Sequence, residues 1–187
     1  MRSILLPAAF ALLALAPAWA ADDIASKRVN DPSRGWVASG AGASAVLYDD
    51  PSVQGGKAER FTISAKSANP WDYTAHVSIT KPLAKGDVLL LAFWAKAEQP
   101  PGGATAIVFN ANIQKDSAPY TSLGNGMLSV GPEWKMYFVQ AVADQDYNAD
   151  AVGAQLQLAI DHLVIDLGPL FILNYGKDYD RTKLPKS

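Results

Sequence analysis

The chain has no cysteine among its 187 residues, so no disulfide bond can stabilise it. Its stability must therefore come from a hydrophobic core. Hydrophobic residues make up 49% of the sequence, and a chain of this length can bury a core as a single domain. The missing cysteine also argues against a lipid anchor attached through sulfur.

A surplus of positive charge is also missing. Lysine and arginine number 16 against 18 aspartate and glutamate residues, which gives a formal net charge of −2. Lysine and arginine do not cluster along the chain, so the basic patch that nucleic-acid binding requires is absent. We therefore expect no nucleic-acid partner.

Long hydrophobic runs are confined to the start of the chain. Arg2 precedes an apolar stretch over residues 4–16, and Ala18-Trp19-Ala20 has the small-x-small pattern of a cleavage site. This combination predicts a secretory signal peptide over residues 1–20, and export to the periplasm or the extracellular space. No later run reaches the roughly 18 apolar residues of a membrane-spanning helix, so we expect no transmembrane span.

A sustained 3.6-residue period of apolar residues, the pattern of amphipathic helices, is missing after residue 20. Short stretches with a period of two instead alternate with segments rich in glycine, proline and aspartate. These patterns predict strands within residues 45–48, 59–65, 73–80, 88–97, 104–114, 134–142, 153–160 and 163–175. Strands of this number and spacing favour an all-β, two-sheet antiparallel β-sandwich, with residues 117–126 as a loop.

The domain organisation follows from these segments. After the signal peptide we expect a lead-in segment over residues 21–34 and one sandwich domain over residues 35–176. A polar C-terminal tail, residues 177–187, is expected to fray. The sequence shows no internal repeat and no second domain.

Amide side chains are common on two of the predicted strands. Asn110, Asn112 and Gln114 alternate with apolar residues in one strand, and Gln155 and Gln157 do so in another. A period of two places each set on the solvent face of a sheet whose other face is core. Rows of neutral amides suit a neutral, hydroxyl-rich ligand such as a carbohydrate, with an ordinary solvated sheet face as the alternative.

Residues with the spacing of catalytic motifs are scarce. The Gly-x-Ser-x-Gly turn of serine hydrolases does not occur, and we expect the two histidines, His76 and His162, to be surface residues. A glycosidase needs two facing carboxylates about 5 to 10 Å apart. The three glutamates after the signal peptide, Glu59, Glu98 and Glu133, all lie near predicted turns. We therefore expect no enzymatic activity and assign no catalytic residue.

One acidic segment has oxygen-bearing side chains at alternate positions, as calcium-binding loops do. It runs over residues 144–150, but Ala149 and Gln155 occupy the positions at which an EF-hand loop has glycine and glutamate. A solvated acidic turn is the simpler interpretation. No metal ligand or cofactor is therefore assigned, and a structural calcium elsewhere in the sandwich is left open.

Several aromatic residues stand apart from the core pattern. Sugar rings present apolar C–H faces that stack on tryptophan and tyrosine, while amides and carboxylates bind their hydroxyls. Besides the amides, the predicted ligand-binding residues are Trp71, Asp72 and Tyr73 at the start of a strand, Trp94 on the solvent face of its strand beside Lys96, and Tyr120 in a loop. For Trp71, a plug at the edge of the core is the alternative. Trp36 and Trp134 are expected in the core.

The order of these motifs resembles that of a known protein family. The motifs are Asn69-Pro70-Trp71-Asp72, the stretch from Leu83 to Leu90 leading to Phe93-Trp94-Ala95-Lys96-Ala97, then Pro119-Tyr120-Thr121, Trp134 and Leu173-Asn174-Tyr175-Gly176. In this order and spacing they resemble carbohydrate-binding modules of the family 4/9/22 type, which are galactose-binding-like jelly rolls often joined to bacterial xylanases. The resemblance covers about residues 35–176. It implies a jelly-roll sandwich that binds a glycan, without catalysis, in a groove on the concave face of one sheet.

The expected function is therefore that of an exported, noncatalytic protein that binds a neutral poly- or oligosaccharide by aromatic stacking and amide hydrogen bonds. No catalytic domain is recognised in the chain, so a separate glycan-processing enzyme is the expected protein partner. Two alternatives stay open: a structural or protein-interaction sandwich of the cell envelope, and a small glycan-active hydrolase that works through aspartates such as Asp72. The groove requires both amide rows to lie on adjacent strands of one sheet, with Trp71 and Tyr120 at its rim.

Overall fold

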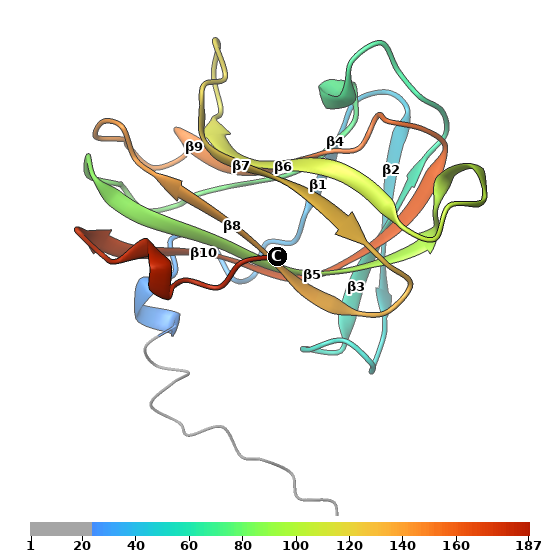
Figure 1. Cartoon of the computed structure of the whole chain (residues 1–187), viewed down its shortest axis with the longest axis horizontal. Helices are drawn as coiled ribbons and strands as arrows, with labels where there is room; N and C mark the ends of the chain where they lie inside the picture. The colour runs from blue at the N-terminus through green and yellow to red at the C-terminus, as the bar shows by residue number, and fades with distance from the viewer. Residues whose placement is uncertain (1–23) are drawn as a thin grey trace, which may run out of the picture.

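A computed structural model describes residues 24–187 as a β-sandwich (Figure 1). The predicted signal peptide, residues 1–20, lies outside the described residues. Two sheets of five strands each stack face to face, and all paired strands run antiparallel. The predicted all-β, two-sheet antiparallel sandwich is confirmed. Within residues 24–187, no helix is long and apolar enough to cross a bilayer.

The sheet called the front sheet below has the strand order β1-β4-β9-β6-β7. Its strands are β1 (Val37–Ser39), β4 (Thr74–Ser78), β9 (Val152–Gln157), β6 (Ile107–Lys115) and β7 (Ser122–Val130). The other, the back sheet, has the order β2-β3-β10-β5-β8. Its strands are β2 (Ala43–Asp49), β3 (Lys57–Ile63), β10 (Leu163–Lys177), β5 (Asp87–Gln99) and β8 (Lys135–Val142). The connections contain the 3-10 helices η1 (Pro70–Asp72) and η2 (Pro101–Gly103), and a third, η3 (Arg181–Lys183), lies in the C-terminal tail.

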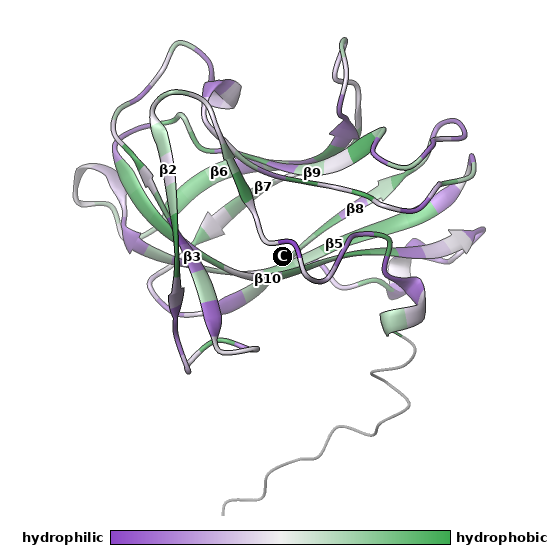
Figure 2. Cartoon of the chain, turned by 180° about the vertical axis from the view of Figure 1, so that it is seen from behind, coloured by the Kyte–Doolittle hydropathy of each residue, from purple (hydrophilic) through white to green (hydrophobic). Residues whose placement is uncertain are grey.

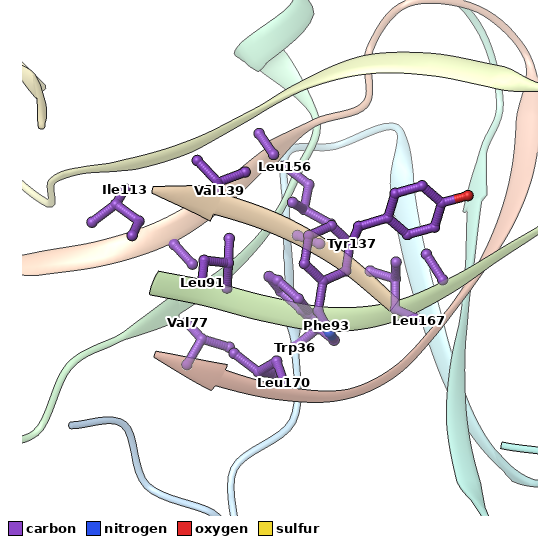
Figure 3. Close-up of a cluster of buried hydrophobic side chains, with 14 of the residues drawn as sticks. Trp36, Val77, Leu91, Phe93, Ile113, Tyr137, Val139, Leu156, Leu167 and Leu170 are labelled. Atoms are coloured by element: carbon purple, nitrogen blue, oxygen red, sulfur yellow. The ribbon is translucent and has the colours of Figure 1, made fainter. Parts of the chain in front are cut away.

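The core fills the space between the two sheets (Figure 3). In β6, the apolar residues between the amides, Phe109, Ala111 and Ile113, are completely buried. They belong to the same cluster as Leu91 and Phe93 of the back sheet. Figure 2 shows the resulting pattern, with hydrophobic segments along the strands and many hydrophilic segments in the connections. The period of two therefore gives each sheet one core face and one outer face.

Trp36 closes one side of the core, as the sequence predicts. Its indole ring meets the ring of Phe93 edge to face, with the centroids 5.5 Å apart. Its Nε1 donates a hydrogen bond to the carbonyl oxygen of Gly168 at 3.2 Å. Because the polar atom of this buried ring is paired, the residue fills the core without a desolvation penalty.

The segment predicted as a loop over residues 117–126 is shorter than expected, because β7 already begins at Ser122. Glycines at 124 and 126 make this part of the sequence look like a turn, but they are strand residues. A Cβ atom at Gly124 would lie 2.2 Å from the carbonyl oxygen of Gln140 in β8. Glycine is therefore required where β7 of the front sheet approaches β8 of the back sheet.

Both ends of the described chain lie against the back sheet, and the C-terminal tail is more ordered than the sequence predicts. Leu184 is 5% exposed and joins a second apolar cluster on the outer face of the back sheet. The side chain of Gln140 in β8 donates to the carbonyl oxygen of Leu184. In the lead-in segment, the side-chain oxygen of Asn30 accepts a hydrogen bond from the backbone of Ile172 at 2.8 Å.

Candidate ligand-binding groove

The two amide rows lie side by side, because β6 and β9 are hydrogen-bonded neighbours in the front sheet. The register pairs Asn110 with Gln157 and Asn112 with Gln155. The Nδ2 atom of Asn110 donates to the Oε1 atom of Gln157 at 3.3 Å. Two amide patterns separated by about 40 residues in the sequence thus form one continuous patch on the outer face of the front sheet.

This patch is part of two rows of side chains that cross the whole front sheet. Antiparallel partners lie on the same face, so the pairing extends each amide pair to the neighbouring strands. One row consists of Val37, His76, Gln155, Asn112 and Asn125. The other consists of Ser39, Thr74, Gln157, Asn110 and Met127. Apolar Val37 and Met127, which are 60% and 69% exposed, stand at opposite edges of the otherwise polar face.

A hollow of about 670 Å³ lies over these rows and is called the amide groove. It is lined by Ser39, Trp71, Thr74, Asn112, Gln114, Pro119, Tyr120, Ser122, Gln155 and Gln157. No residue in this lining carries a charge. The groove brings together six of the predicted ligand-binding residues, and a seventh, Asn110, is hydrogen-bonded to Gln157.

Trp71 stands at the rim of the amide groove because η1 holds it there. Its side chain is 57% exposed. The turn is fixed by Asp72, whose carboxylate accepts hydrogen bonds from the hydroxyl of Ser67 at 2.6 Å and from the backbone of Asn69 at 3.0 Å. These bonds lower the pKa of Asp72, with the Ser67 hydroxyl as the largest cause. Asp72 does not line the groove, so the structure gives this predicted contact residue the role of positioning Trp71.

Tyr120 stands at the rim on the connection between β6 and β7. Its side chain is 59% exposed, and its backbone has a φ of 56°. A tyrosine in this left-handed region costs roughly 1 kcal/mol or more. The backbone N–H of Tyr120 donates to the carbonyl oxygen of Ser117 at 2.8 Å, which helps to hold the turn. Strained backbone of this kind clusters at binding sites, where it holds a side chain in the position that the ligand needs.

Asn112 lies in the lining of the amide groove with one half of its amide unpaired. The residue is 3% exposed, and its Oδ1 atom accepts a hydrogen bond from the hydroxyl of Ser122 at 3.4 Å. Its Nδ2 atom is the one buried side-chain nitrogen or oxygen in residues 24–187 that has no hydrogen-bond partner. Leaving such a donor unsatisfied costs about 1–3 kcal/mol. The atom is closed to solvent as well as unpaired, so an acceptor could reach it only after the side chain or its neighbours move.

Trp94 lies far from this set in the fold, contrary to prediction. It belongs to β5 of the back sheet, where it pairs with Met136, and its Nε1 donates to the Oε1 of Gln54 at 3.1 Å. Trp94 lies two residues from Lys96 in the same strand, so both side chains point to the outer face, as predicted. The alternation within one strand does not, however, show which of the two sheets contains that strand. Trp94 therefore cannot contact a ligand together with Trp71.

Tyr73 is also placed differently from the prediction. Its neighbour Thr74 pairs with Gln157 on the groove face, so Tyr73 points to the opposite side and packs against the core. A Cβ atom at Gly42 would lie 2.3 Å from the tyrosine ring, which shows how closely the chain passes over it. Alternation turns Tyr73 away from the amide groove, so the structure does not bring it together with the other predicted ligand-binding residues.

Trp134 differs from its predicted place in the core. Its Nε1 donates to the Oδ2 of Asp50 at 3.0 Å, and the ammonium of Lys96 lies 5.3 Å from its ring centroid. As the sequence indicates, Trp134 points to the same side of the chain as Met136. In β8, however, this is the outer side, and Tyr137 faces the core instead. The outer side of the back sheet therefore carries two partly exposed tryptophans, Trp94 and Trp134.

The sequence-based prediction missed Thr74, Asn125 and Met127 on the groove face. Thr74 lies in a predicted strand with the correct phase, so the signal was present. Asn125 lies in β7, within the segment predicted as a loop, and is flanked by glycines at 124 and 126. These glycines occupy the inward positions of the strand. Because glycine has no apolar side chain, the alternation of apolar and polar residues that identifies a strand is missing there.

His76 is partly buried in a polar cluster, rather than being the plain surface residue that was predicted. Its Nε2 atom lies 2.9 Å from the Oδ1 of Asp116, while the hydroxyl of Ser78 donates to the Oδ2 of the same carboxylate at 2.7 Å. A hydrolytic relay requires the serine to bond to the histidine. Here both bond to the aspartate, so the arrangement does not activate a nucleophile.

In the acidic segment over residues 144–150, two of the three carboxylates accept hydrogen bonds from the protein itself. Asp144 accepts a hydrogen bond from the hydroxyl of Tyr147 at 2.5 Å. Asp146 accepts one from the backbone N–H of Lys85 at 2.7 Å. Over the part of the chain that the structure describes, no three histidine, aspartate or glutamate side chains form a group suited to a metal ion.

No protein-family model matches the chain, and no curated protein matches it in sequence. Solved structures do resemble it in fold. A family 4 carbohydrate-binding module is 19% identical with a TM-score of 0.57, and the match covers 75% of this chain and 94% of that module.

Two further solved structures are named for the polysaccharides that they bind. The CBM22-1 xylan-binding domain of Paenibacillus barcinonensis Xyn10C is 15% identical with a TM-score of 0.56, over 80% of this chain and 92% of that domain. The N-terminal cellulose-binding domain of Cellulomonas fimi β-1,4-glucanase C is 16% identical with a TM-score of 0.53, over 79% of this chain and 93% of that domain. The chain thus has the jelly-roll β-sandwich fold of carbohydrate-binding modules of the family 4 and family 22 type.

Proposed function

We propose that the protein binds a neutral poly- or oligosaccharide in the amide groove, without catalysing a reaction. The observation that carries this proposal is the register of β6 and β9, which joins the two amide rows into one patch between Trp71 and Tyr120. Amides offer both donors and acceptors to sugar hydroxyls, and the aromatic rings offer flat faces to sugar C–H groups. The uncharged lining favours a neutral glycan over an anionic one.

The size of the groove also suits this ligand class. Its volume of about 670 Å³ falls within the range of about 300–1,000 Å³ that is common for small-molecule sites. The hollow lies on a sheet face five strands wide, with strands about 4.8 Å apart. A short stretch of an extended polysaccharide chain fits such a concave face.

The chemistry of the groove favours binding over catalysis. Glycoside hydrolysis needs two carboxylates on opposite sides of the scissile bond. The groove lining contains none, and the carboxylate of Asp116 is engaged by His76 and Ser78. We further propose that residues 1–20 direct export and that a separate glycan-processing enzyme acts on the same polysaccharide.

Affinity electrophoresis in gels that contain xylan, soluble cellulose derivatives, mixed-linkage β-glucan or mannan tests this proposal. The wild type is expected to be retarded by at least one neutral polysaccharide. Trp71→Ala removes the exposed ring at the groove rim, and we expect it to weaken binding at least about tenfold, or roughly 1.4 kcal/mol. Trp94→Ala removes a tryptophan from the back sheet and is the matched control, with unchanged retardation.

Circular dichroism should show that both variants keep the strand content of the wild type. Two results would contradict the proposal. One is a wild type that no neutral polysaccharide retards. The other is an equal loss of binding in the Trp71 and Trp94 variants, because Trp94 is on the opposite sheet.

A further inference from the structure

The edge strand β2 of the back sheet is unusually open. Within residues 24–187 it pairs with β3 on one side and with no strand on the other. Its four central residues, from Ser44 to Leu47, are all exposed. Val46 and Leu47 are 63% and 62% exposed although both are apolar. Successive strand residues point to opposite faces, so this strand is exposed on both faces as well as along its edge.

The hydrogen bonds to β3 show which backbone groups are free. Asp50 donates its N–H to the carbonyl of Gly56 at 3.1 Å, and Ser64 donates to Gly42 at 3.2 Å. Both bonds continue the register of the β2–β3 pair, so the even-numbered residues of β2 bond to β3. Ala45 and Leu47 therefore direct their N–H and C=O groups away from β3, toward the open edge.

Proteins usually protect such an edge with charged residues, proline, a bulge or a covering segment. The edge strand β8 of the back sheet has such a cover. Its Phe138 donates a backbone N–H to the hydroxyl of Ser187 at 2.6 Å, and that hydroxyl donates to the carbonyl of Phe138 at 3.2 Å. In β2, the stretch from Ala43 to Tyr48 has neither a charged residue nor a proline.

A second chain can reach this edge. Ala45 and Leu47 have the phase that faces the front sheet, yet both are exposed. The front sheet therefore does not extend over them, and β2 projects beyond its margin. An added strand would gain backbone hydrogen bonds from Ala45 and Leu47 and would bury the exposed apolar side chains on both faces.

We propose that β2 pairs with β2 of a second copy of this chain, antiparallel and with Val46 on the two-fold axis. In this register, Ala45 of one copy faces Leu47 of the other, and both have outward-directed backbone groups, so the two residues exchange two hydrogen bonds. Val46 faces its own equivalent at the close, non-hydrogen-bonded position. Asp49 faces Ala43, so no like charges meet. The edge is thus self-complementary, as an isologous interface must be.

The dimer has a consequence for binding that rests on the proposed function of the amide groove. The two-fold axis of an antiparallel strand pair is perpendicular to the sheet. The two back sheets would therefore continue into one another, with both front sheets on the same side. Both amide grooves would face the same polysaccharide surface, and a bivalent protein gains avidity when its two sites reach the same target.

Sedimentation equilibrium of the exported protein over a wide concentration range tests the dimer without any glycan. The wild type is expected to approach the mass of a dimer as concentration rises. Val46→Lys and Val46→Glu each place two like charges opposite one another across the axis, and each variant should remain a monomer. An equimolar mixture of the two variants should dimerise again. Val108→Lys changes another exposed valine, in β6, which has a strand on either side, and should dimerise as the wild type does.

Three results would overturn this proposal. The first is a wild type that stays monomeric at every concentration. The second is a dimer that persists in both Val46 variants. The third is a mixture of the two variants that does not dimerise, because the register centred on Val46 requires the opposite charges to meet. None of these results depends on glycan binding, so the dimer and the proposed function can fail separately.

Discussion

At the scale of single residues, Asn112 differs from the other amides in the groove. Its Nδ2 is buried without a partner, whereas Asn110 donates to Gln157. An orphaned buried donor costs stability, and this one belongs to a residue of the groove lining. The sequence alternation places Asn112 on the outer face, but only the packing of the strands shows that one half of its amide is unsatisfied.

Roles of single residues were the least predictable part of the candidate site. Asp72 and Trp71 are adjacent in the sequence, yet one fixes the turn and the other is presented at the rim. Trp94 has a phase that correctly indicates an outer face, but the sequence does not indicate the sheet. Side-chain roles depend on partners far along the chain, and alternation within one strand carries no information about those partners.

A prediction at this scale concerns Asp166, which is completely buried on the back sheet. Its carboxylate accepts hydrogen bonds from Arg60 at 2.8 Å and from the hydroxyl of Tyr48 at 2.7 Å, and Lys96 lies 3.3 Å away. Burial raises the pKa of Asp166, but the hydrogen bonds from Arg60 and Tyr48 and the nearby ammonium outweigh it. The pKa therefore lies below its ordinary value of 3.8.

A lowered pKa in the folded state stabilises the protein above the ordinary pKa, and this stabilisation is lost as the pH falls through the lowered value. We expect Asp166→Asn to reduce the free energy of unfolding at neutral pH by about 2–4 kcal/mol, because it removes the buried carboxylate between Arg60 and Lys96 and leaves them only the half-exposed Glu98 as a shared partner. Urea denaturation should show this difference shrinking below pH 3.8. Asp49→Asn, which removes an exposed pair with Lys57, is the control with little effect. A difference that grows with acidity would contradict this assignment.

At the scale of elements, most strands could be predicted, because alternation of apolar and polar residues survives in the sequence. The strands around Phe61, Val77 and Leu156 are examples, since each has core residues at every second position. The N-terminal part of β7 could not be predicted in this way. Its inward positions at 124 and 126 are glycines, and glycine gives no hydropathy signal.

Gly124 provides the test at this scale. We expect Gly124→Ala to lower the free energy of unfolding by about 1–3 kcal/mol, because the new methyl group would overlap the backbone of β8 at Gln140. Gly131→Ala is the matched control, because a Cβ atom there would have no heavy atom within 4 Å. Thermal unfolding followed by circular dichroism measures both. Equal stability of the two variants would show that β7 and β8 do not approach one another as described.

At the scale of the whole molecule, the two outer faces of the sandwich differ in character. The outer face of the front sheet carries the uncharged amide groove. The outer face of the back sheet carries charged residues around Asp166 and, separately, the apolar cluster on which the C-terminal tail packs. The sequence predicts two polar outer faces, but the difference between them arises from strand order, which brings β6 next to β9 in one sheet and places β10 between β3 and β5 in the other.

The central claim is that the amide groove is the glycan-binding face, and side-chain NMR tests it most directly. The protein, labelled with nitrogen-15, is titrated with xylohexaose, with cellohexaose and with an oligosaccharide of any other polysaccharide that retards it. The side-chain amide signals of Asn110, Asn112, Gln114, Gln155 and Gln157 and the indole signal of Trp71 are expected to shift together, while the indole signal of Trp94 stays in place. Shifts at Trp94 with unchanged groove amides would contradict the account.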